Sequence, residues 1–134
     1  MKELSMVAGG REFTLRYTVQ VICDAEEKYG SINTLQKRMG GDDKPMEAAL
    51  DMMAYMANAG EKHAGRKADF TAEWFKQNLS PKQLNDARVL TQRAMLVGMH
   101  RECAEDEDVA VDAVLEEIRK KKVESKTKNQ PAEG

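Results

Sequence analysis

The sequence predicts a mainly α-helical protein that begins with a short β-hairpin. Of its 134 residues 33% are charged and only 5% are aromatic, which suits helices with solvated faces better than a sandwich or barrel. Apolar residues recur at helical spacing over most of the chain, between helix stop and start signals. We expect a single helical domain over residues 1–122, with about five to six helices from residue 18 onward, and a flexible, disordered tail over 123–134.

Two runs of alternating apolar residues lie near the N-terminus, in residues 3–8 and 11–17, with Gly9 and Gly10 between them. Period-two alternation is typical of strands, and glycine tolerates the positive φ angles of a tight turn. These residues predict a β-hairpin over 3–17. Because an isolated hairpin is only marginally stable in water, we expect it to pack on the helices that follow.

Residues 18–41 predict two short helices. Thr18 is expected to cap the first, over Val19–Tyr29, which Gly30 ends. Ser31 is expected to cap the second, over Ile32–Met39, which ends at a glycine pair. We expect one face of the first helix to carry Val19, Ile22, Glu26 and Tyr29, with Cys23 beside them. The acids of this helix are expected to lie mostly on the solvated side.

The next helix is the most apolar part of the chain. Asp42 and Asp43 are expected to cap it, and Pro45 suits its first turn. From Met46 to Ala59 its polar side chains form one narrow strip, made of Glu47, Asp51 and Asn58. A helix that is apolar around most of its circumference is central to a core or lies in an interface.

Residues 60–69 are expected to form a loop or a frayed extension of that helix. Thr71 is expected to cap a short helix that carries Trp74 and Phe75, and Ser80 to cap another that begins with Pro81. The apolar stripe expected on this last helix is Leu84, Ala87, Thr91, Met95 and Gly98, widened by Val89, Leu90 and Leu96.

The C-terminal part changes from acidic to basic. Glu102 to Glu117 contains eight acids and no bases, and Arg119 to Lys128 contains six bases and one acid. Four apolar residues recur at i, i+3, i+4 and i+7 and predict a final amphipathic helix; they are Val111, Val114, Leu115 and Ile118. A basic tail can bind phosphates, but the acidic segment before it would repel nucleic acid, and no nucleic-acid partner is expected.

The residues that could carry chemistry do not form a complete site in the sequence. His100 and Cys103 could share a helix face as metal ligands, but the further ligands would have to come from Glu102, Glu105 or His63. Cys23 has no histidine close to it in the sequence. We expect no catalytic residues, no cofactor and no metal, with a small thiol or metal enzyme as an alternative.

The composition favours a reducing cytoplasm. Cys23 and Cys103 are too few for a disulfide framework, and we expect both to be free, buried thiols. No run of about 18 apolar residues is present, so no membrane span is expected. The first ten residues lack the apolar stretch of a signal peptide.

Methionines crowd two of the expected helices, at positions between 46 and 56 and at 95 and 99. Methionine fills irregular gaps in cores, but it also lines surfaces that accept varied apolar partners, and the sequence leaves both open. Because the apolar helix has more apolar faces than a small core needs, we hypothesise a partner-binding surface on it and on the aromatic helix. The residues of this surface are Met52, Tyr55, Met56, Trp74 and Phe75.

The order of these elements resembles the tail assembly chaperones of long-tailed bacteriophages and prophages, over roughly residues 10–100. The features that carry the resemblance are the strand-to-helix junction "LRYT", the helix stop "E-x-x-x-G-S-I", the helix end "MANAGE" and the helix restart "LSP". The acid-then-base region after residue 101 has no counterpart in the family pattern. None of these features is a catalytic signature.

The resemblance implies a small helical protein that binds the long tape measure protein and keeps it soluble. It also implies assistance to tail tube subunits, frequent self-association, and absence from the finished virion. Members of this family act in the cytoplasm of the bacterial host, and they have no active-site residues to carry over. The alternative from a different class is a small helical regulator that binds DNA through its basic C-terminal tail.

Overall fold

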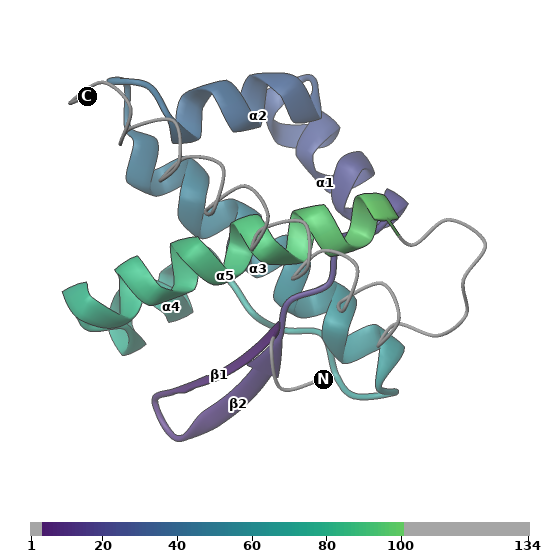
Figure 1. Cartoon of the computed structure of the whole chain (residues 1–134), viewed down its shortest axis with the longest axis vertical. Coiled ribbons are helices and arrows are strands. Elements are labelled where there is room, and N and C mark those ends of the chain that lie inside the picture. Colours follow the sequence, from purple (N-terminus) through teal and green to yellow (C-terminus); the bar gives the residue numbers. More distant parts are fainter. Residues whose placement is uncertain (1–3, 101–134) are drawn as a thin grey trace, which may run out of the picture.

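The computed structural model describes residues 4–100, and the expected hairpin-plus-helices class is confirmed there (Figure 1). The described elements in chain order are β1 (Ser5–Ala8), β2 (Arg11–Thr14), α1 (Val19–Tyr29), α2 (Ile32–Met39), α3 (Pro45–His63), α4 (Ala72–Asn78) and α5 (Pro81–His100). The predictions of a final amphipathic helix and of a disordered tail fall outside the described residues.

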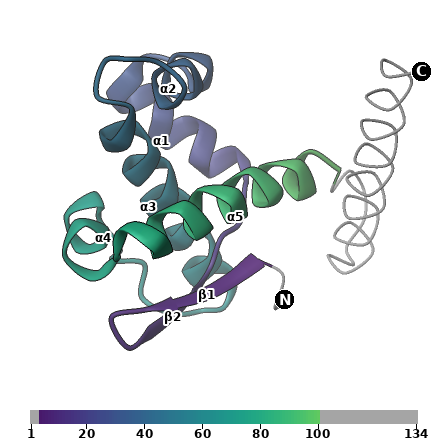
Figure 2. The same cartoon turned by 60° about the vertical axis from the view of Figure 1, so that its left-hand side comes forward.

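The elements are arranged around α3. In both views α5 crosses α3, with α1 and α2 on one side of the crossing and the hairpin on the other (Figures 1 and 2). Helices α1, α2, α4 and α5 and strand β2 all contact α3. Twelve of its 19 residues are buried, so the apolar helix is the centre of the core.

The hairpin forms as the alternation predicted, with a shorter extent. β1 and β2 pair antiparallel from Ser5↔Thr14 to Ala8↔Arg11. The two turn glycines both have positive φ, 57° at Gly9 and 74° at Gly10, which is the geometry of a two-residue turn that matches the twist of the strands. Residues 15–18 continue from β2 as a link to α1.

The buried side of α1 differs from the expected one. Val21 and Ala25 are completely buried, whereas Val19 is 74% exposed and Cys23 is exposed. Val21, Ala25 and Tyr29 follow one another at intervals of four, so they share a face, and Val19 and Cys23 lie on the opposite face. The expectation that Cys23 is a buried thiol is therefore wrong.

Three of the five expected caps form. The hydroxyls of Ser31, Thr71 and Ser80 accept hydrogen bonds from backbone N–H groups three residues later, at 3.0–3.1 Å. Thr18 makes no side-chain cap bond, and its buried Oγ1 has no partner among the described residues. The predicted cap at Asp42 and Asp43 is also wrong, because Lys44, in the left-handed region at φ 48°, precedes α3.

Two glycines let the link between β2 and α1 pass very close to two helices. A Cβ placed on Gly60 of α3 would lie 2.0 Å from the carbonyl oxygen of Thr14. A Cβ on Gly98 of α5 would lie 2.6 Å from the carbonyl oxygen of Tyr17. The backbone N–H of Arg16 also donates to the carbonyl oxygen of Met56 at 3.1 Å. The segment from Thr14 to Tyr17 therefore packs directly against the backbone of α3 at one end and of α5 at the other.

Gly60→Ala is expected to lower the free energy of unfolding by about 1–3 kcal/mol, because the added methyl must displace the backbone at Thr14. Gly40→Ala is the matched control, since a Cβ there meets nothing within 4 Å and its φ is −102°. Urea unfolding followed by circular dichroism measures both variants. Equal midpoints for the two would contradict the close approach.

Candidate functional site

The polar strip of α3 holds neighbouring elements in place. Asp51 is only 7% exposed, and its Oδ2 accepts hydrogen bonds from Lys28 Nζ at 2.7 Å and from the Tyr29 hydroxyl. The Asn58 amide donates to the carbonyl oxygen of Phe70 at 2.9 Å and accepts from its N–H at 2.8 Å. The strip therefore fixes α1 and the segment that leads into α4.

The C-terminal end of α3 carries a second charged cluster. Glu61 is 3% exposed and accepts hydrogen bonds from Arg66 at 2.9 and 3.1 Å, and Arg11 of β2 lies 3.5 Å away. Arg11 also stacks 3.7 Å above the Phe70 ring and donates to Asp69 at 2.8 Å. That hydrogen bond lowers the pKa of the Asp69 carboxyl. The cluster joins the hairpin to α3 and to the loop before α4.

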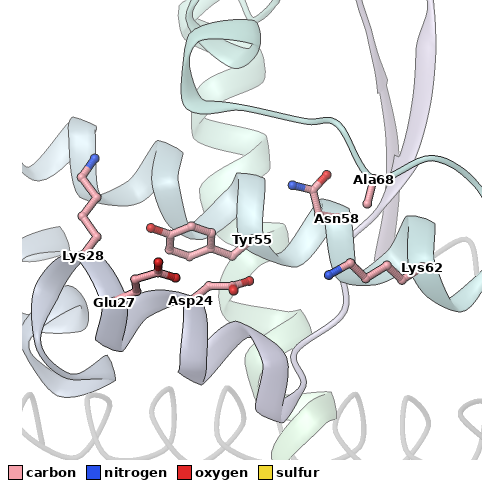
Figure 3. Close-up of a pocket in the computed structure, with 7 residues that line it drawn as sticks. All are labelled: Asp24, Glu27, Lys28, Tyr55, Asn58, Lys62 and Ala68. Atoms are coloured by element: carbon pink, nitrogen blue, oxygen red, sulfur yellow. The ribbon is translucent and has the colours of Figure 1, made fainter.

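An open groove of about 630 Å³ lies between α1 and α3 (Figure 3). Asp24 and Glu27 lie beside the Tyr55 ring, and Lys62 lies farther along α3 (Figure 3). The remaining lining residues are Lys28, Asn58 and Ala68. Both signs of charge line the groove, and the Asn58 amide is already bonded to Phe70. The groove therefore does not select one charge of ligand.

Two tyrosines near this groove are hard to ionise. Burial is the main reason that the pKa of Tyr55 is raised to about 12, and the negative charges of Asp51, Asp24 and Glu27 add to it. Burial also raises the pKa of Tyr29, with a further contribution from its hydrogen bond to Asp51. Both phenols are therefore neutral at ordinary pH, and Tyr29 acts as a hydrogen-bond donor.

The hypothesised partner-binding residues do not form one surface. Met52, Met56 and Phe75 are 0% exposed, so none of them can contact a partner unless the core repacks. Tyr55 and Trp74 are half-buried: Tyr55 lines the groove, whereas Trp74 packs edge-on against the aromatic residues around it. The hypothesis is corrected for the three buried residues, because neighbouring elements cover α3 around most of its circumference.

The residues considered for thiol or metal chemistry lie apart or outside the described part. Cys23 is an exposed, free thiol on α1, and His63 is exposed at the end of α3. Cys103, Glu102 and Glu105 fall outside the described residues. Within residues 4–100 no three side chains of His, Cys, Asp or Glu come together as a metal site would need. Nor does that part of the chain contain a helix with the length and apolarity to span a membrane.

Helix α5 presents a second apolar stripe that sequence reasoning missed. The buried side of α5 consists of Ala87, Leu90, Thr91, Ala94 and Val97. On the opposite side lie Asn85, Val89, Gln92, Leu96 and Met99, which we call the outer face of α5. Val89, Leu96 and Met99 are 55%, 39% and 71% exposed, so the expectation that Val89 and Leu96 widen the buried stripe is wrong. The available signal was the heptad spacing of the five outer-face positions, which are separated by four, three, four and three residues.

Two shallow depressions adjoin the outer face of α5. One, of about 360 Å³, lies between α5 and α2 and is lined by Gln36, Met39, Gly40, Arg88, Gln92 and Met95. The other, of about 350 Å³, is lined by Asn85, Arg88, Val89 and Gln92. Because they share Arg88 and Gln92, the two form a continuous uneven surface beside the exposed apolar residues. Such a surface suits an elongated partner better than a small molecule.

Comparison with known protein families, with curated protein sequences and with solved structures finds no match for this chain. The functional argument therefore depends on the residues themselves and on the surface that the fold leaves open.

Asp51→Ala is expected to lower the free energy of unfolding by about 1.5–3 kcal/mol, because Lys28 and the Tyr29 hydroxyl both lose their acceptor. Asp24→Ala is the control: its hydrogen bond from Gln20 of the same helix is exposed to solvent, and a loss of about 0.5 kcal/mol or less is expected. Denaturant unfolding at neutral pH measures both. A loss no larger than that of the control would show that the cluster does not fix α1.

The raised tyrosine pKa values predict a loss of stability in alkali. Unfolded tyrosine ionises near pH 10, whereas folded Tyr55 ionises near 12, so the unfolded state releases its proton first and the free energy of unfolding falls between these values. Tyr55→Phe is expected to reduce that fall. Chemical unfolding at about pH 9 and about pH 11 measures it, and an unchanged fall in the variant would contradict the assignment.

Proposed function

We propose that this protein is a non-enzymatic phage tail assembly chaperone that binds the tape measure protein, keeps it soluble and assists assembly of the tail tube. It would act in the cytoplasm of the bacterial host and leave before the virion is complete. The observation that supports this proposal is the outer face of α5, an exposed apolar stripe on a domain whose central helix is already enclosed. The resemblance over residues 10–100 supplies the class of partner.

The spacing of that stripe fits a helical partner. Asn85, Val89, Gln92, Leu96 and Met99 are separated by four, three, four and three residues, the heptad spacing with which two helices pack side by side. Val89, Leu96 and Met99 supply the apolar contacts, and Met99 can adapt to different partner side chains because methionine is unbranched. The two polar positions limit how strongly the stripe attracts other surfaces.

The proposed binding surface replaces the one expected from the central helix. A surface for a chaperone must be available in the folded protein, and Met52 and Met56 are not. Single exposed apolar residues are normal on any protein, as at Val7 and Val19, but three along one side of one helix form a patch. This patch is where a helix of the tape measure protein is proposed to lie, as in helix-in-groove recognition.

Co-expression with the long coiled-coil protein encoded by the neighbouring gene tests the proposal. That protein is expected to be insoluble alone, to become soluble with this chain, and to be retained with it in a pull-down. The combined variant Val89→Glu with Leu96→Glu is expected to lose both effects while its circular dichroism stays helical, because both side chains are exposed.

The matched control is Val7→Glu with Val19→Glu, which changes two valines elsewhere that are at least as exposed as Val89 and Leu96. It is expected to behave as the unchanged chain does. Indifference of the neighbouring protein to this chain would refute the chaperone proposal. Salt-dependent DNA binding that disappears on removal of residues 119–134 would favour the DNA-binding alternative instead.

A further inference from the structure

Two arginines flank the outer face of α5. All five residues of that face are exposed, and in heptad notation Val89 and Leu96 are a positions while the other three are d positions. In the same heptad Arg88 is a g position and Arg93 is an e position, so each lies directly beside the apolar stripe. The charges at e and g positions choose the partner when two helices pack side by side.

Neither arginine has a carboxylate partner within residues 4–100. By contrast, Arg11, Arg38 and Arg66 each lie 2.8–3.6 Å from a carboxylate oxygen. Both flanking arginines are half-buried, and Arg88 borders the two depressions beside the outer face. Arginine binds carboxylates through several N–H donors at once, so these two guanidinium groups suit the acids of a partner.

We propose that the outer face of α5 selects a partner helix whose apolar stripe is flanked by glutamate or aspartate, and that Arg88 and Arg93 determine this selection. Acids beside the partner's stripe would pair with the two arginines, whereas bases there would be repelled. The inference rests on the proposed function, which supplies a helical partner, and it adds the charge that the bound part of that partner carries.

The polar residues of the stripe add to the selection. Gln92 lies between Val89 and Leu96 along the stripe and borders both depressions. A polar side chain in an apolar seam favours the alignment in which the partner places a polar side chain opposite it. Gln92 therefore favours one alignment of the partner helix, while the arginines choose its charge.

A second copy of the chain is a poorer occupant of this face. Asp86 is the only acid beside the stripe, so two such faces would bring together more like charges than opposite ones. In a parallel pair, Arg88 of one copy would face Arg93 of the other, and this repulsion would occur twice. An anionic membrane also fits poorly, because the stripe includes two polar residues and α5 contains only three bases.

Two designed helical peptides test the charge preference on the full chain. Both are about 21 residues long, the length of three heptads, with isoleucine and leucine at the a and d positions. One carries glutamate at every e and g position and the other carries lysine, so each repels its own copies at neutral pH. These two peptides differ only in the charge that the arginines are proposed to read.

Methyl NMR of the methionines measures the binding. The acidic peptide is expected to shift the signals of Met95 and Met99 and to leave those of Met52 and Met53, which are 0% exposed, unchanged. It is expected to bind about tenfold more tightly than the basic peptide, since two exposed ion pairs replace two repulsions. High salt is expected to reduce this ratio.

Variants of the arginines locate the preference. Arg88→Glu with Arg93→Glu is expected to reverse it, and Arg88→Gln with Arg93→Gln is expected to remove it. The matched control is Lys44→Glu with Lys67→Glu, which alters the net charge by the same amount as the first variant. Both lysines are exposed and border neither depression, so the control is expected to keep the preference. Circular dichroism checks that each variant remains helical.

Equal affinity for the two peptides, or binding of neither, would overturn the inference. A control that shifts the preference as much as the arginine variants do would also overturn it, because the effect would then belong to the net charge. Met99 signals that change on dilution without peptide would assign the face to a second copy instead. Signals that phosphatidylglycerol vesicles shift as strongly as the acidic peptide does would assign it to a membrane.

Co-expression with the neighbouring coiled-coil protein separates this inference from the proposed function. If Val89→Glu with Leu96→Glu releases that protein but Arg88→Glu with Arg93→Glu does not, the proposed function stands and the charge selection is wrong. If that protein ignores the unchanged chain, the proposed function is wrong, and the peptide measurements still decide the charge preference of the face.

Discussion

The rest of the structure depends on one constraint: the segment that joins β2 to α1 packs directly against the backbone of two helices. Gly60 and Gly98 have no side chain where the carbonyl oxygens of Thr14 and Tyr17 lie against α3 and α5. The link is held at both points, and the hairpin and α1 lie on opposite sides of the crossing of α3 and α5, as Figure 1 shows. Small residues at close backbone contacts thus decide how the elements are arranged.

The enclosure of α3 explains both the polar clusters and the position of the candidate interface. Surrounding elements cover most of α3, so its buried polar side chains need partners from those elements, and Asp51, Asn58 and Glu61 have them. Because the apolar residues of α3 are buried in the core, the exposed apolar residues available to a partner are those of α5. The methionines divide accordingly: those of α3 from residue 52 onward are buried, whereas Met99 is exposed.

Most elements could be predicted because their signals are local. Each of these signals affects only the few residues next to it. Examples are the glycine pair of the hairpin turn, the capping hydroxyls of Ser31 and Thr71, and the helix start at Ser80–Pro81. The expected cap at Asp42 and Asp43 does not form, although its signal was local too. Lys44 adopts a left-handed conformation at the start of α3, and no side-chain cap bond forms there.

The candidate surface was harder to predict than the elements. Met52 and Val89 are both apolar residues on helices, and nothing local distinguishes a core position from an exposed one when a helix has apolar residues on two sides. The heptad spacing of Asn85, Val89, Gln92, Leu96 and Met99 was present in the sequence, but so was the competing stripe through Ala87 and Thr91. Packing partners decide between two such stripes.

The sequence by itself determined the helical class, the hairpin, the order and approximate limits of the helices, and the absence of a strong net charge. Those properties follow from periodicity, caps and composition, which are local. Only the tertiary structure decided that α3 is enclosed, that Cys23 and Val19 face outward, and that α5 presents Val89, Leu96 and Met99. Burial depends on which segments distant in sequence pack together, here around the contacts at Gly60 and Gly98.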